Sequence, residues 1–121
     1  LNLLARGELC VCDIVSVRVT CKKVHEDRST LVFHDRHPQA PVHLLILPRR
    51  HVQSVSAAPA DERTARLFAR LLLTARHVAS ELSLKKTGYR LVINTGTDAG
   101  QAVPHLHVHL LAGRAFGWPP G

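Results

Sequence analysis

Aromatic side chains are scarce in this chain of 121 residues, which has one tryptophan, one tyrosine and three phenylalanines. Because single-stranded nucleic acids are held largely by stacking of bases on aromatic rings, this scarcity argues against specific nucleic-acid binding. Long apolar runs are absent as well: none approaches the roughly 20 residues that span a bilayer, so we expect no membrane segment. The first residues lack the basic leader and apolar core of a signal peptide, which predicts a protein of the cytoplasm or the nucleus.

Cysteine is rare, and its three copies, Cys10, Cys12 and Cys21, all lie within the first 21 residues. An odd number of cysteines without a secretion signal predicts free thiols in a reducing compartment. A zinc site built from them together with His25 matches no common ligand spacing. We therefore expect these thiols to be unpaired.

Acidic residues are few: nine aspartates and glutamates stand against sixteen lysines and arginines, which gives a net charge of +7. Such a charge attracts anions, and two classes of partner compete, phosphate-bearing small molecules and nucleic acids. The basic residues are scattered along the chain and form no run, which favours small molecules. The length fits one domain over residues 1–121.

The apolar pattern predicts an α+β domain, an antiparallel sheet of about five strands with one long helix packed on a face. Residues 14–22 and 30–34 read as strands on either side of a turn at 25–29. Residues 42–47 form an almost continuous apolar run that Pro48 ends, which is typical of a central strand. Further strands are expected at 89–94 and 105–110, joined by a glycine-containing loop at 95–101, and the histidine-bearing strand 105–110 closes the sheet.

Apolar residues repeat at spacings of three and four between Pro59, which suits a first helical turn, and Gly88, a plausible helix stop. The predicted buried stripe consists of Phe68, Leu71, Leu72, Ala75, Val78, Ala79 and Leu82. Arginines occupy most of the other side, at positions 63, 66, 70 and 76. We interpret these arginines as a solvated helix face.

Three histidines, His105, His107 and His109, alternate with apolar residues near the end of the chain. In a strand this alternation places all three imidazoles on one face. A neutral imidazole is a nucleophile able to attack activated phosphorus, and neighbouring imidazoles fix its tautomer. The row therefore predicts chemistry on phosphorus, with a metal site as the competing interpretation.

A fourth histidine, His43, lies on the predicted central strand, where a buried imidazole needs a polar partner. The histidine row is the natural candidate for that partner. If two row histidines bound zinc, His43 could supply a further ligand. The loop from Gly96 to Gln101 could present backbone N–H groups to a phosphate.

The stretch H-L-H-V-H-L-L (105–111) resembles the His-x-His-x-His-x-x signature of the histidine triad (HIT) superfamily. Two longer stretches resemble its histidine triad nucleotide-binding branch: FHDRHPQAPVHLLILPRRHV (33–52) and YRLVINTGTDAGQAVPHLHVHLLAGRAFGWPPG (89–121). The resemblance covers about residues 24–121, whereas residues 1–21 do not resemble the opening helix of that branch. The Fhit-like and galactose-uridylyl-transferring branches share the fold but lack this tail.

The resemblance implies an enzyme without cofactor or metal that hydrolyses the P–N bond of purine nucleoside 5′-phosphoramidates, such as AMP-NH₂ or AMP linked to lysine. It implies His107 as the nucleophile, His109 as the α-phosphate contact, and a supporting relay of His105 and His43. The implied nucleotide-binding positions are Phe33, Asp35, Arg36, Asn94, Gly100, Gln101, Ala102, His107 and His109. It also implies a homodimer whose two sheets join into one, with Trp118 reaching the partner's site.

Two positions depart from that branch. Ala102 stands where serine or threonine is usual, whose hydroxyl contacts the phosphate and helps the departing amine. Arg36 replaces an apolar residue beside the nucleoside. The alanine leaves open an alternative, a nucleotide-binding or scaffold protein with low turnover. A dinucleoside polyphosphate hydrolase is a further alternative.

Overall fold

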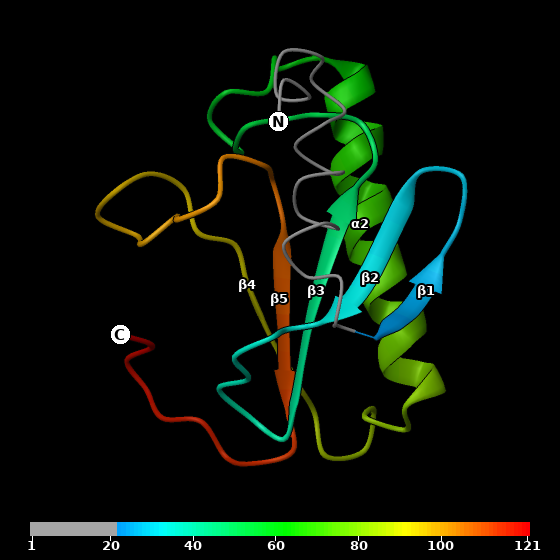
Figure 1. Cartoon of the computed structure of the whole chain (residues 1–121), viewed down its shortest axis with the longest axis vertical. Coiled ribbons are helices and arrows are strands. Elements are labelled where there is room, and N and C mark those ends of the chain that lie inside the picture. The colour runs from blue at the N-terminus through cyan, green and yellow to red at the C-terminus, as the bar shows by residue number, and fades with distance from the viewer. Residues whose placement is uncertain (1–21) are drawn as a thin grey trace.

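Antiparallel strands form one sheet, and a long helix covers one of its faces (Figure 1). The computed structural model describes residues 22–121, and the statements below concern this range. The strands are β1 (Lys23–Glu26), β2 (Thr30–His34), β3 (Val42–Pro48), β4 (Arg90–Val92) and β5 (Val108–Ala112), and the helix is α2 (Glu62–Glu81). The predicted α+β architecture is confirmed. Within residues 22–121, no helix has the length and apolarity needed to cross a bilayer.

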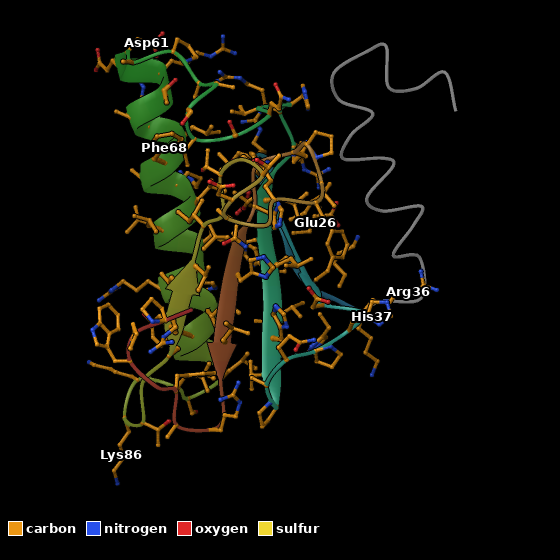
Figure 2. All side chains as sticks on the ribbon, turned by 90° about the vertical axis from the view of Figure 1, so that its left-hand side faces the viewer. Glu26, Arg36, His37, Asp61, Phe68 and Lys86 are labelled. Carbon is orange, nitrogen blue, oxygen red and sulfur yellow. The ribbon has the colours of Figure 1, made fainter. Side chains whose placement is uncertain are left out.

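The two faces of the sheet have different neighbours, and β3 shows this most clearly. Leu44 and Ile46 belong to the core between the sheet and α2, whereas Leu45 and Leu47 pack in a second cluster on the opposite face. All four side chains are at most 2% exposed. Burying each leucine or isoleucine contributes about 1.5–3 kcal/mol, so β3 is a central strand, as its apolar run predicts. Figure 2 shows α2 lying against one face only.

The β1–β2 turn is shorter than the sequence predicts, because His25 and Glu26 belong to β1. The turn is organised by Asp27, whose side chain accepts hydrogen bonds from the backbone N–H groups of Ser29 and Thr30 at 2.9 Å. Burial alone would raise the pKa of Asp27, but hydrogen bonds from His25, Ser29 and Thr30 hold that pKa well below its usual range. The predicted strand 14–22 and the three cysteines lie outside the described residues, except for Lys22.

The helix begins and ends at positions other than those predicted. Asp61, not Pro59, sets its start, because the Asp61 side chain accepts the backbone N–H of Thr64 at 2.9 Å and caps the first turn. It ends at Glu81, followed by Ser83 with φ of 59°, well before Gly88. Of the predicted stripe, Leu72 and Leu82 are exposed, which corrects that prediction.

At one end of the sheet the strand order is β3-β5-β4. β4 is therefore the edge strand and β5 lies inside the sheet, contrary to the prediction that the histidine strand closes it. Both strands also begin later than predicted: β4 begins at Arg90 and β5 begins at Val108. Of the three histidines of the row, only His109 lies within regular strand structure.

Candidate functional site

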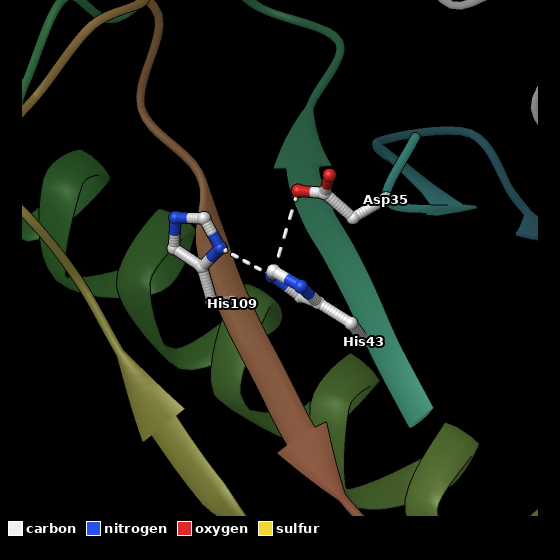
Figure 3. Close-up of side chains that lie close together, drawn as sticks. All are labelled: Asp35, His43 and His109. Carbon is white, nitrogen blue, oxygen red and sulfur yellow. Dashed lines mark hydrogen bonds and ion pairs between the residues drawn. The ribbon is translucent and has the colours of Figure 1, made fainter. Parts of the chain in front are cut away.

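Imidazoles from β3 and β5 meet on the sheet face opposite α2. In the β3–β5 register Leu45 is opposite His109, and His43 is opposite Leu111, so His43 and His109 are diagonal neighbours on one face. Their rings approach with Nε2 of His43 2.9 Å from Nδ1 of His109. Figure 3 shows this pair with the Asp35 carboxylate above it. The strand register, fixed by the flanking leucines, is what brings the two rings together.

The proton positions in this pair follow from one backbone contact. The N–H of Gln39 donates to Nδ1 of His43 at 3.0 Å, so that nitrogen is an acceptor. In neutral His43 the ring proton therefore lies on Nε2 and is donated to Nδ1 of His109. A neutral His109 then carries its own proton on Nε2, which makes Nε2 a hydrogen-bond donor for a ligand.

The middle histidine of the row, His107, has the opposite arrangement. Its Nδ1 lies 2.8 Å from the backbone carbonyl oxygen of His105, and because a carbonyl only accepts, Nδ1 carries the proton. In the neutral ring Nε2 consequently bears the lone pair. The rings of His107 and His109 are 5.0 Å apart between centroids, so a lone pair and a donor N–H belong to adjacent rings. His107 is partly exposed, as a nucleophile must be.

The first histidine of the row, His105, is fully buried. Burial lowers its pKa to about 4, although the hydrogen bond from its Nε2–H to the carbonyl oxygen of Pro48 at 2.8 Å raises it. His105 is therefore neutral near pH 7, and its Nδ1 accepts from Nδ1–H of His51, 3.3 Å away. The relay inferred from the resemblance, His105 with His43, is thus replaced by two pairs, His43 with His109 and His51 with His105.

His51 is a site residue that the sequence reasoning missed. Its segment is held against the histidine row by a 2.6 Å hydrogen bond from the N–H of Leu106 to the carbonyl oxygen of Val52. His51 lies in an irregular segment after β3, where no periodicity links it to residue 105. The available signal was a fourth imidazole in the stretch 33–52, beside His34, His37 and His43.

The loop before the histidine row is closed by the side chain of Gln101. Its Oε1 accepts the N–H of Gly96 at 3.0 Å, and its Nε2 donates to the carbonyl oxygens of Gln53 and Val103. The backbone N–H of Gln101 bonds to Gly96 and that of Gly100 to Thr97. These donors are occupied, so we assign Gln101 and Gly100 to loop shape.

Ala102 follows this closed loop and is exposed. Within residues 22–121 its backbone N–H makes no hydrogen bond, so it can donate to a ligand. Its methyl side chain offers no hydroxyl. The loop therefore presents one backbone donor at the position where the resemblance implies a hydroxyl as well.

Asp35 is the acidic member of the site. Its side chain is 11% exposed, with Oδ2 3.5 Å from Nε2 of His43 and Oδ1 accepting the N–H of His37 at 2.8 Å. The other predicted positions differ in exposure. Phe33 is buried, Asn94 is partly buried, and Arg36 and Trp118 are exposed.

Asp35, His43 and His109 also form the one group of possible metal ligands found within residues 22–121, with ligand atoms within 4.8 Å of one another. A metal-bound neutral histidine donates its other ring N–H to an acceptor. On His43 that other nitrogen already receives the N–H of Gln39, so a metal on Nε2 would set two donors face to face at 3.0 Å. The three side chains therefore do not fit a resident metal as long as the N–H of Gln39 donates to Nδ1 of His43.

The arrangement combines two groups that phosphoryl chemistry requires, a nucleophile and a hydrogen-bond donor. His107 offers a lone pair, and His109 offers an N–H in the adjacent ring. A nucleophile beside a donor suits attack on phosphorus, because the donor stabilises charge on a phosphoryl oxygen.

Comparisons with known proteins agree on one family. Residues 17–116 match the sequence model described as "HIT domain". The chain is 43% identical over 108 residues to a 14 kDa zinc-binding protein of Zea mays, covering 89% of this chain and 84% of that protein. A solved HIT family hydrolase from Legionella pneumophila Philadelphia 1 superposes with a TM-score of 0.83 at 40% identity, over 92% and 97% of the two chains. A histidine triad nucleotide-binding protein from Candida albicans gives 0.71 at 27% identity, over 90% and 81%.

Proposed function

The chain belongs to the HIT domain family, and from this premise we propose that it is a purine nucleoside phosphoramidase. It hydrolyses the P–N bond of nucleoside 5′-phosphoramidates of the AMP-NH₂ or AMP-lysine type. The observation that carries the proposal is the hydrogen bond from Nδ1 of His107 to the carbonyl oxygen of His105. This bond leaves the Nε2 lone pair of His107 for attack on phosphorus.

The reaction runs in two displacements at one phosphorus atom. Nε2 of His107 forms a bond to the α-phosphorus, and the bond to the amine nitrogen breaks; the amine keeps that electron pair and takes a proton from water. Water then attacks the same phosphorus, the P–Nε2 bond breaks, and the nucleoside monophosphate leaves with release of a proton. His107 returns to its neutral form, so atoms and charges balance over the cycle.

The flanking groups stabilise the phosphoryl oxygens during both displacements. The Nε2–H of His109, oriented by His43, donates to one oxygen, and the backbone N–H of Ala102 donates to the phosphate. The Asp35 carboxylate is an acceptor for the ribose hydroxyls. Phe33, Arg36 and Asn94 complete the nucleotide contacts in this proposal.

Ala102 supports a second candidate function, nucleotide binding with little turnover. In the reaction above, the amine takes its proton from water because Ala102 has no hydroxyl to deliver one. The binding contacts do not depend on that hydroxyl. Under this alternative AMP binds in calorimetry while hydrolysis of its phosphoramidate is negligible.

Zinc binding is the third candidate, because a relative from Zea mays is named a zinc-binding protein. Its ligands in this chain would be Asp35, His43 and His109. The N–H of Gln39 on Nδ1 of His43 opposes this arrangement. If the protein binds zinc, protein purified without a histidine tag should contain stoichiometric metal. Absence of such metal, with activity that a chelator does not change, would rule out a zinc enzyme.

We also propose a homodimer in which β4 pairs with its counterpart. β4 has a sheet neighbour on one side only, and the adjacent Tyr89 and Ile93 are 37% and 42% exposed. Trp118, 84% exposed in the C-terminal tail, is available to reach the partner's site.

The proposed function is tested with an adenosine 5′-phosphoramidate assayed beside a diadenosine polyphosphate. The wild-type protein should release amine and AMP from the phosphoramidate and be slower on the polyphosphate, and His107→Ala should lose the activity. A wild-type rate in His107→Ala would remove His107 as the nucleophile. Preference for the polyphosphate would instead favour the dinucleoside polyphosphate hydrolase.

A further inference from the structure

A groove lined by arginines lies between the N-terminal half of α2, the β1–β2 turn and the end of β3. Its volume is about 520 Å³, within the range of sites that hold small ligands or short peptide segments. Its basic lining consists of Arg28, Arg49, Arg50, Arg63, Arg66 and Arg70. None of these residues belongs to the histidine site. Three of the four arginines predicted to form a solvated helix face, Arg63, Arg66 and Arg70, therefore lie beside arginines from the β1–β2 turn and from the segment after β3.

Acidic residues offset only part of this charge. Glu26 pairs with Arg49, and Glu62 pairs with Arg66 at 3.2 Å. Asp61, whose pKa is lowered mainly by the hydrogen bond from the N–H of Thr64, also lies in the field of Arg50 and Arg63.

Four of the groove arginines are not neutralised by a direct contact with another residue of the range 22–121. Within residues 22–121, no hydrogen bond or ion pair is made by Arg28, Arg50, Arg63 or Arg70. Like charges gathered around one concavity repel each other unless an anion lies between them. The groove is therefore suited to several negative charges from outside the chain.

The groove also has an apolar part. Leu67 and Leu73 line it beside the arginines, and Leu73 is 56% exposed. Stacking on aromatic rings holds the bases of single-stranded nucleic acids, and no aromatic residue lines the groove. An apolar surface rimmed by guanidinium groups matches a peptide that carries an apolar side chain between acidic ones.

We propose that this groove binds an acidic segment of a partner protein, with aspartate, glutamate or phosphorylated side chains on both sides of an apolar residue. Guanidinium groups bind carboxylates and phosphates with paired N–H donors, which gives such a segment a defined orientation. The apolar residue packs on Leu67 and Leu73. The groove lies on the helix side of the sheet, whereas His43 and His109 lie on the opposite face, so a docked partner leaves the imidazoles accessible.

The test uses fluorescence anisotropy with a labelled peptide of glutamate pairs separated by leucines, beside an all-glutamate peptide and a single-stranded oligonucleotide of equal charge. One variant combines Arg63→Gln with Arg70→Gln in the groove. The matched control combines Arg76→Gln with Lys85→Gln, which removes the same charge from exposed positions outside the groove. Leu73→Gln tests the apolar contact. Circular dichroism establishes that each variant is folded.

The groove variant should bind the glutamate-leucine peptide about tenfold more weakly than the wild type, whereas the control stays within about twofold. Leu73→Gln should weaken binding of this peptide but not of the all-glutamate peptide. Equal losses in groove and control variants would overturn the proposal in favour of diffuse charge attraction. Absence of saturable peptide binding, or tighter oligonucleotide binding through the same arginines, would overturn it as well.

Discussion

The backbone N–H of Gln39 lies 3.0 Å from Nδ1 of His43 and donates to it. This contact, made by a loop residue to a strand residue, decides where the proton of His43 lies. It directs the Nε2–H of His43 to His109 and so makes the outer nitrogen of His109 a donor. A phosphoryl oxygen can use that donor, whereas a metal on His43 is opposed by the same contact.

Removal of the His43 imidazole should therefore disorder the donor on His109. We expect His43→Ala to lower kcat by about 10- to 100-fold, the usual loss when a partner that orients a functional histidine is removed. KM for the phosphoramidate should change less, because the nucleotide contacts remain. His43→Gln places an amide N–H near the position of Nε2 and should recover part of the rate. Steady-state kinetics of the two variants provide the comparison, and equal rates in both would contradict the role given to His43.

A hydroxyl at position 102 should speed departure of the amine. Ala102→Ser adds a group that can deliver a proton where the wild type relies on water. We expect kcat to rise by roughly tenfold or more, with little change in the affinity for AMP measured by calorimetry. Ala102→Gly adds no hydroxyl and is the matched control. An unchanged rate in Ala102→Ser would show that the missing hydroxyl does not limit turnover.

Stability should fall on the acid side of neutral because of His105. Burial lowers the pKa of His105 from its usual 6.5 to about 4, so between these values the unfolded chain binds a proton that the folded chain excludes. The stabilisation is fully present above about pH 6.5 and is lost as the pH falls toward 4. Its size is on the order of 3 kcal/mol. Urea unfolding at a series of pH values measures it, and His105→Gln should show a shallower dependence over that window.

The turn after β5 should tolerate no side chain at Gly113. This residue has φ of 96°, and a Cβ atom added there would lie 2.7 Å from Cβ of Pro41, in the loop that connects Asp35 to β3. Gly88 has a similar φ of 93° but open space around it, so Gly88→Ala carries the backbone strain alone. We expect Gly113→Ala to cost about 1–3 kcal/mol more than Gly88→Ala in urea unfolding. Equal losses of stability would mean that Pro41 can move away from the added methyl group without destabilising the fold.

The sequence predicts β2 and β3 well because their apolar patterns are unambiguous, and it places the imidazoles of residues 43 and 109 on strands correctly. It cannot define which imidazoles pair, because the pairing depends on the register that sets Leu45 opposite His109. His51 escapes detection because it lies in an irregular segment. The start of the helix is predicted at the wrong residue because the capping hydrogen bond of Asp61 outweighs the preference of Pro59 for a first turn.

Whether His107 is the nucleophile is decided by mass spectrometry of the reaction with an adenosine 5′-phosphoramidate, quenched within the first turnovers. We expect a peptide that contains His107 and is heavier by one adenylyl group, bound through the ring nitrogen Nε2 and absent from His107→Ala. An adduct on another residue, or hydrolysis at the full rate with no adduct under conditions that preserve phosphohistidine, would contradict this expectation.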